Sequence, residues 1–97
     1  MAKRKIEVEN AVSPGHVQSV DADKYEATRD AYMSVLIREA PGMTPAEIKS
    51  ALTPKLSQDL FPGGATAGWW AKCVQLDLEA KGIIVRGPGS PVRLRKA

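Results

Sequence analysis

A segment in the last third of the chain, residues 66–81, combines helical periodicity with apolar residues on two opposite sides. At about 100° per residue, one side of this helix consists of Ala67, Ala71, Val74 and Leu78. The opposite side carries a second apolar row, called the outer stripe here, which consists of Trp69, Cys73, Leu76 and Ala80. A helix that is apolar on two sides is normally buried on two sides. The question that this helix raises is therefore what covers its second apolar side.

Three sources of cover for the outer stripe are open. The N-terminal arm of the same chain can fold over it, with Ile6, Val17 or Val20 in contact with Trp69. A second subunit can cover it in a dimer or larger assembly. The third alternative is an exposed groove for another protein, in which Trp69 would be the main anchor because interface hot spots favour Trp. The neighbouring Trp70 points about 100° away and is expected to pack at the edge of the core.

Start and stop signals predict two further helices before this one. Asp23 and Glu26 have capping-box spacing, and a helical stripe of apolar residues continues through about Glu39. The next helix begins at Thr44, with Pro45 in its first turn, and ends or kinks at Pro54.

The end of the chain predicts a β-hairpin. Gly82 terminates the third helix, and residues 83–86 and 92–95 read as strands around a Gly- and Pro-rich turn.

Residues 1–22 read as a basic tip and an extended arm with one or two short strands. With only 97 residues there is room for one core of ordinary size. We therefore expect an α+β protein, with the arm at 1–22 and three helices and a C-terminal hairpin within residues 23–97.

Positive charge is concentrated toward the C-terminal end. The net charge is +3, and residues 43–97 carry eight basic residues against four acidic ones. Residues 83–97 contain no acid, and their basic residues are Arg86, Arg93, Arg95 and Lys96. The N-terminal tip adds Lys3, Arg4 and Lys5. Such groups neutralise phosphates without reading sequence, so together they form a predicted nucleic-acid-binding set. The alternative is that they are solvated charges on a surface hairpin and a frayed terminus.

The chain contains no complete motif for a catalytic site or for a bound metal ion. Gly63 and Gly68 have the glycine spacing of a phosphate-binding loop, but Trp69-Trp70 stands where Lys and Ser/Thr are required. The single His16 and the single Cys73 cannot supply a zinc site with the usual spacings. We expect no enzyme activity, no cofactor and no small-molecule substrate.

The order of helix, helix, loop, helix and hairpin resembles a winged helix-turn-helix domain. Two stretches carry the likeness: residues 42–48, Gly-Met-Thr-Pro-Ala-Glu-Ile, and residues 74–84, Val-Gln-Leu-Asp-Leu-Glu-Ala-Lys-Gly-Ile-Ile. The second is similar to the end of a recognition helix running into the wing. The resemblance implies DNA binding, but a helix that reads bases needs a polar outer side. The apolar outer stripe departs from that requirement.

The whole chain also resembles a family of small uncharacterised bacterial proteins. The matching stretches are residues 20–26, Val-Asp-Ala-Asp-Lys-Tyr-Glu; residues 40–44, Ala-Pro-Gly-Met-Thr; and residues 61–70, Phe-Pro-Gly-Gly-Ala-Thr-Ala-Gly-Trp-Trp. This resemblance implies a bacterial cytoplasmic protein and assigns no activity.

The cysteine count and the hydropathy of the chain agree with that compartment. Cys73 is the only cysteine, so no internal disulfide can form and a reducing compartment is expected. No apolar run approaches the roughly 18 residues of a membrane span, and the basic start is not followed by the apolar stretch of a signal peptide. We expect a cytoplasmic protein with no membrane partner.

Two functional hypotheses follow from these observations. The first is a non-enzymatic module that binds DNA through the basic hairpin and the N-terminal tip. The second is a module for protein interaction or self-assembly that uses the outer stripe.

Overall fold

The computed structural model of the protein describes residues 4–13 and 15–97. The elements follow in the order β1 (Lys5–Val8), β2 (Gln18–Asp21), α1 (Ala22–Val35), α2 (Pro45–Leu52), α3 (Ala67–Ala80), β3 (Ile84–Arg86) and β4 (Leu94–Lys96). Short 3-10 turns lie at Thr53–Lys55 and Pro62–Gly64. Three main helices followed by an antiparallel strand pair confirm the predicted α+β fold class.

Helix α1 differs from the sequence prediction at both ends. Its N-cap is Asp21, whose carboxylate accepts hydrogen bonds from the backbone N–H groups of Asp23 and Lys24 at 2.9 and 3.2 Å. The predicted cap at Asp23 is therefore wrong, because the residue that caps the helix is Asp21. The helix also ends at Val35 rather than near Glu39. The reason is tertiary: the carbonyl of Ile37 accepts a hydrogen bond from Lys96 N–H, which draws this segment into extended backbone beside β4.

The caps of α2 and α3 are confirmed. Thr44 and Glu47 form a reciprocal capping box at the start of α2, and Pro45 occupies the first turn. At the end of α3, Gly82 has φ of +74°, and Ile83 N–H bonds back to Leu78 C=O at 3.0 Å. This backbone bond closes the helix in the manner of a glycine C-cap.

The four strands form two separate antiparallel pairs. In the N-terminal pair, Ile6 faces Val20 and Val8 faces Gln18. In the C-terminal pair, Val85 faces Arg95. Met43, between α1 and α2, forms an isolated antiparallel bridge with Leu94 and so extends the second pair.

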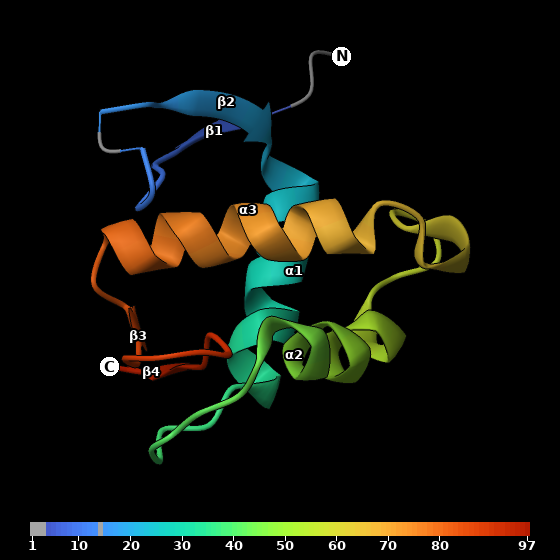
Figure 1. Ribbon diagram of the computed structural model, residues 1–97. Coiled ribbons are helices and arrows are strands. Elements are labelled where there is room, and N and C mark those ends of the chain that lie inside the picture. The colour runs from blue at the N-terminus through green and yellow to red at the C-terminus, as the bar shows by residue number, and fades with distance from the viewer. Residues whose placement is uncertain (1–3, 14) are drawn as a thin grey trace.

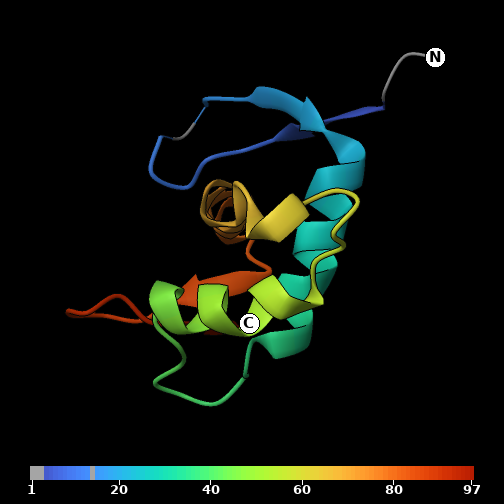
Figure 2. The same ribbon diagram turned by 90° about the vertical axis from the view of Figure 1, so that its right-hand side faces the viewer.

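Helix α3 lies at the centre of the arrangement. Figure 1 shows the β1–β2 hairpin on one side of α3, α2 and the β3–β4 pair on the other, and α1 crossing behind. The view along α3 in Figure 2 gives the same order. The most deeply buried large side chains are Tyr25, Tyr32, Ile48, Leu52, Phe61, Leu78, Ile84 and Leu94. Val8 and Val20, each 5% exposed, belong to the same core, so the N-terminal hairpin is packed into it.

Candidate interaction surface

The outer stripe of α3 is covered in its middle and open at both ends. Trp69 is 51% exposed and Ala80 is exposed, whereas Cys73 and Leu76 are half-buried. The opposite side of the helix, with Val74 and Leu78, is fully buried in the core. The cover comes from the same chain: the β1–β2 hairpin lies beside α3 (Figure 2), and its residues Val8 and Gln18 line a common groove with Cys73 and Leu76.

Two backbone groups attach the hairpin to α3. Ala11 N–H donates to Leu76 C=O at 3.2 Å, and Glu9 N–H donates to the Asp77 carboxylate at 2.8 Å. These bonds follow β1 directly, at the point where the chain leaves the strand. The hairpin therefore contacts α3 through its main chain as well as through Val8.

Asp77 is fully buried and connects three parts of the molecule. Besides the Glu9 N–H, its carboxylate accepts a hydrogen bond from the Tyr25 hydroxyl and an ion pair from the Lys81 ammonium at 2.9 Å. Burial, followed by this hydrogen bond, raises the pKa of the Tyr25 hydroxyl above its usual range. No local pattern indicates this network, because Tyr25 and Glu9 are distant from Asp77 along the chain.

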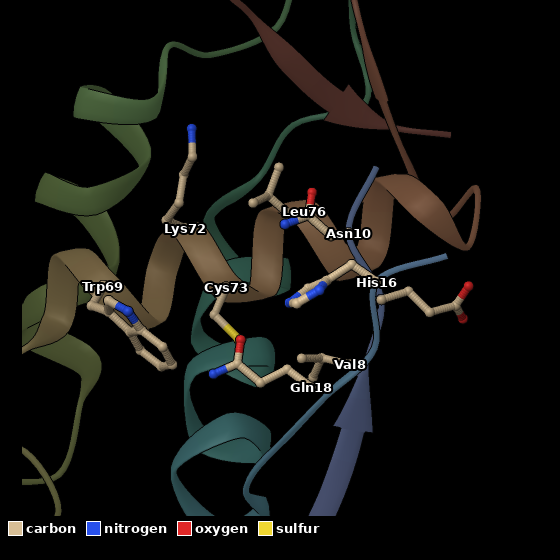
Figure 3. Close-up of a pocket in the computed structure, with 9 residues that line it drawn as sticks. Val8, Asn10, His16, Gln18, Trp69, Lys72, Cys73 and Leu76 are labelled. Carbon is tan, nitrogen blue, oxygen red and sulfur yellow. The ribbon is translucent and has the colours of Figure 1, made fainter. Parts of the chain in front are cut away.

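A groove of about 180 Å³ separates the hairpin from the outer stripe. Figure 3 shows Trp69 at one end of it and His16 and Gln18 reaching from the hairpin toward Cys73. The residues that line it are Val8, Glu9, Asn10, His16, Gln18, Trp69, Lys72, Cys73 and Leu76. Three of the four predicted stripe residues thus lie on one wall. The fourth, Ala80, lies in a neighbouring hollow of about 360 Å³ that shares Glu9, Asn10 and His16 with the groove.

The hairpin wall of the groove carries polar side chains that are available to a ligand. The Asn10 carbonyl accepts from the N–H groups of Val12 and Ser13, which leaves its amide NH₂ group as a donor. The side chains of His16 and Gln18 make no hydrogen bond to residues 4–13 or 15–97. Sequence reasoning did not select Asn10, His16 or Gln18, because nothing in an extended arm indicates which residues will face a helix.

The Cys73 thiol contributes an apolar surface to this groove. Burial raises its pKa to about 11, with a smaller contribution from the charge of Asp77. The thiol is therefore protonated at neutral pH, and a protonated thiol is a poor nucleophile.

Comparison with known proteins places the chain in a family. A model described as "Family of unknown function (DUF6958)" matches residues 5–94. The chain belongs to this family. The match includes both walls of the groove, and it confirms the resemblance to a family without assigned activity. No curated protein and no solved structure matches the chain.

Two arginines of the C-terminal hairpin form ion pairs or hydrogen bonds within the protein. Arg86 forms an ion pair with Glu79 at 3.0 Å, and Glu79 also accepts from the Gln75 amide. Arg93 donates to the Gly42 carbonyl at 3.3 Å and approaches Glu47 at 3.8 Å.

The other two basic residues of the strand pair have no acidic partner among the described residues. Within residues 4–13 and 15–97, the Arg95 side chain hydrogen-bonds only to the Lys96 carbonyl, at 3.5 Å, and the Lys96 side chain forms no hydrogen bond or ion pair.

Of the N-terminal basic residues, Arg4 is paired with acidic side chains and Lys5 is not, among the described residues. Arg4 forms ion pairs with Asp23 and Glu26 of α1, and the pKa of Glu26 is lowered by its hydrogen bond to Arg4. Lys5 is exposed on β1, and the predicted residue Lys3 lies outside the described part of the chain.

No group of three or more His, Cys, Asp or Glu side chains in residues 4–13 and 15–97 has a geometry that could hold a metal ion. None of the helices in that part of the chain is long and apolar enough to cross a bilayer.

Proposed function

We propose that the protein is a non-enzymatic binding module that takes up an apolar segment of a partner protein between the N-terminal hairpin and α3. The observation that carries the proposal is the position of Trp69. This side chain is half exposed at the end of a groove whose floor is formed by Cys73 and Leu76. Sites that bind other molecules are concave and mostly apolar, with a few polar groups at defined positions. The groove has this composition.

Covering Trp69 would contribute substantially to binding. A Trp side chain presents roughly 200 Å² of surface, so the exposed half is about 100 Å² and its burial contributes about 2.5 kcal/mol. That free energy corresponds to roughly 60-fold in affinity. An exposed Trp of this kind is the residue expected at the centre of an interface.

The orientation of Trp69 is restrained by a neighbouring ring before any partner binds. Its ring packs edge-to-face on Trp70, with centroids 4.9 Å apart and planes at 82°, and Trp70 is 7% exposed. A side chain already held in place loses little conformational entropy on binding. Trp69 is therefore a partly preorganised anchor.

The test is a selection followed by a titration. Random twelve-residue peptides displayed on phage are selected on the immobilised protein, and enriched peptides are measured by fluorescence anisotropy. Trp69→Ser should weaken binding roughly 60-fold. Ile83→Ser is the matched control, since Ile83 is 43% exposed and does not line the groove, and it should change affinity less than twofold. An absence of enriched peptides, or peptides that bind Trp69→Ser as well as wild type, would refute the proposal.

Self-association through the same face is examined with the same variants. Sedimentation velocity would show a wild-type dimer that Trp69→Ser converts to a folded monomer if the occupant is a second copy of the chain.

Nucleic-acid binding through the β3–β4 pair is the second candidate function. The observation in its favour is that Arg95 and Lys96 have no acidic partner among residues 4–13 and 15–97. Contacts of this kind give salt-sensitive binding that does not depend on sequence. A labelled mixed-sequence duplex titrated at about 50 mM and 200 mM salt should then bind far more weakly at the higher salt. Replacing Arg93 and Arg95 by Ala should weaken binding and reduce its salt dependence. No binding at the lower salt eliminates this candidate.

A further inference from the structure

The positive charge beside Trp69 comes from two lysines that, unlike Arg86 and Arg93, have no acidic partner among the described residues. Lys72 lines the groove one helical turn after Trp69. Lys49 of α2 lies against the first turn of α3, about 3.4 Å from the place where a Cβ at Gly68 would stand. Within residues 4–13 and 15–97, neither lysine forms an ion pair or a side-chain hydrogen bond. Both ammonium groups are thus available to a ligand.

A second hollow connects these two lysines. It has a volume of about 190 Å³ and lies between α1, α2 and α3. Its lining includes Tyr32, Gly68 and Gln75 besides the two lysines, and none of the lining residues is acidic. Lys72 lines both this hollow and the groove. The surface next to Trp69 is therefore continuous, apolar at its floor and cationic on one side.

The start of α3 adds to the positive potential there. The N-cap residue Thr66 makes no side-chain hydrogen bond to the first turn, so the N–H groups of that turn have no side-chain cap. The N-terminus of a helix carries partial positive charge and favours a neighbouring anion. A ligand with a carboxylate on this side of Trp69 is complementary to the surface.

We infer that the partner segment is an extended acidic peptide with one apolar anchor residue. This inference rests on the proposed function and specifies its ligand. The anchor occupies the groove against Trp69, Cys73 and Leu76. One or two Asp or Glu residues meet Lys72 and Lys49, and the free amides of Asn10 and Gln18 bond to the peptide main chain.

The spacing within such a peptide follows from the geometry of α3. Side chains at i and i+3 of a helix, such as Trp69 and Lys72, lie about 5–6 Å apart. An extended chain advances about 3.3 Å per residue. The acidic residue should therefore stand within about two positions of the anchor.

A nucleic acid fits the same surface less well. Glu9 lines the groove, and Glu79 lines the neighbouring hollow beyond it. These carboxylates would repel a phosphate backbone that continued past Trp69. Two lysines also form a local cationic site rather than the long positive track that a single strand follows.

The test uses the phage selection in two further ways. Sequences enriched on the wild-type protein should contain an apolar residue with Asp or Glu within two positions. Lys72→Glu and Lys49→Glu should each weaken binding of an enriched peptide by about fivefold to tenfold at low salt. Lys55→Glu, the same charge change at an exposed lysine that lines neither hollow, should change it less than twofold. Circular dichroism confirms that each variant is folded.

The outcomes separate this inference from the function on which it rests. Enriched apolar peptides without acids, which bind Lys72→Glu normally but not Trp69→Ser, would leave the proposed function standing and overturn the acidic ligand. A twelve-nucleotide single-stranded oligothymidylate that displaces the peptide with micromolar affinity in a Trp69-dependent manner would overturn it in favour of a nucleic acid. Failure to enrich any peptide would overturn both.

Discussion

Replacing Asp77 by Asn perturbs the connection between the hairpin, α1 and α3 with almost no change in shape. The carboxylate of Asp77 is fully buried and accepts from the Tyr25 hydroxyl, the Glu9 N–H and the Lys81 ammonium. An amide retains one acceptor oxygen, and its NH₂ group must face at least one of these donors. The charge that strengthens the three bonds is also lost.

The magnitude follows from the exposure of each partner. Lys81 is 36% exposed, so its ammonium can turn to solvent at little cost. The Tyr25 hydroxyl and the Glu9 N–H keep their positions, and a hydrogen bond to a charged group contributes about 1.5–3 kcal/mol. We expect Asp77→Asn to lower the free energy of unfolding by about 3 kcal/mol. For a chain of 97 residues the total is about 5–15 kcal/mol, so this loss is roughly a fifth to three fifths of it, and it lowers Tm by roughly 12–24 °C.

The assay is urea unfolding followed by far-UV circular dichroism. Asp59→Asn is the matched control, since it makes the same chemical change at an exposed carboxylate and should shift stability by less than about 0.5 kcal/mol. Hydrogen exchange adds a local measurement, in which the Glu9 amide should lose protection more than the amides of α2. A decrease in the free energy of unfolding below about 1 kcal/mol for Asp77→Asn would refute the reasoning, because replacing a buried carboxylate with three donors should cost more than that.

Two other perturbations examine the core. Gly42 has φ of +92°, and a Cβ there would overlap the backbone carbonyl of Leu94. Gly42→Ala should therefore lower the free energy of unfolding by more than about 1 kcal/mol in the same urea assay. Unchanged stability would contradict the close approach of the two backbones. Burial raises the pKa of both Tyr25 and Tyr32, so the stability that they contribute is complete below about pH 10 and is lost as pH rises through their folded-state values. Absorbance at 295 nm should therefore stay low in the folded protein near pH 10.5 and rise in urea, whereas equal titration in both states would contradict their burial.

Local signals in the sequence identified the elements whose ends are fixed by neighbouring residues. The capping box of Thr44 and Glu47 and the glycine cap at Gly82 involve partners a few positions apart, so a pattern reveals them. The end of α1 depends on Ile37 bonding to Lys96, far along the chain, and no local pattern carries that information.

The same distinction applies to the candidate surface. Helical periodicity predicted the outer stripe, because the stripe depends only on the orientation of residues within one helix. The sequence left open what covers Trp69, which is 51% exposed in the structure. Asn10, His16 and Gln18 came to face that stripe through a hairpin whose position is set by Val8, Val20 and distant hydrogen bonds. Arg4, predicted as a phosphate contact, is paired with Asp23 and Glu26 because the strand pairing brings its segment beside the start of α1. Whether it also binds nucleic acid stays a prediction.

The attachment of the hairpin to α3 by main-chain N–H groups has an evolutionary consequence. The bonds from Glu9 and Ala11 use backbone atoms that every residue except Pro possesses. The side chain of Glu9 and that of its neighbour Asn10, which form one wall of the groove, can therefore be exchanged with little effect on these two bonds. Relatives could diversify what they recognise by changing this wall, while Asp77 on the facing helix keeps the hairpin in place.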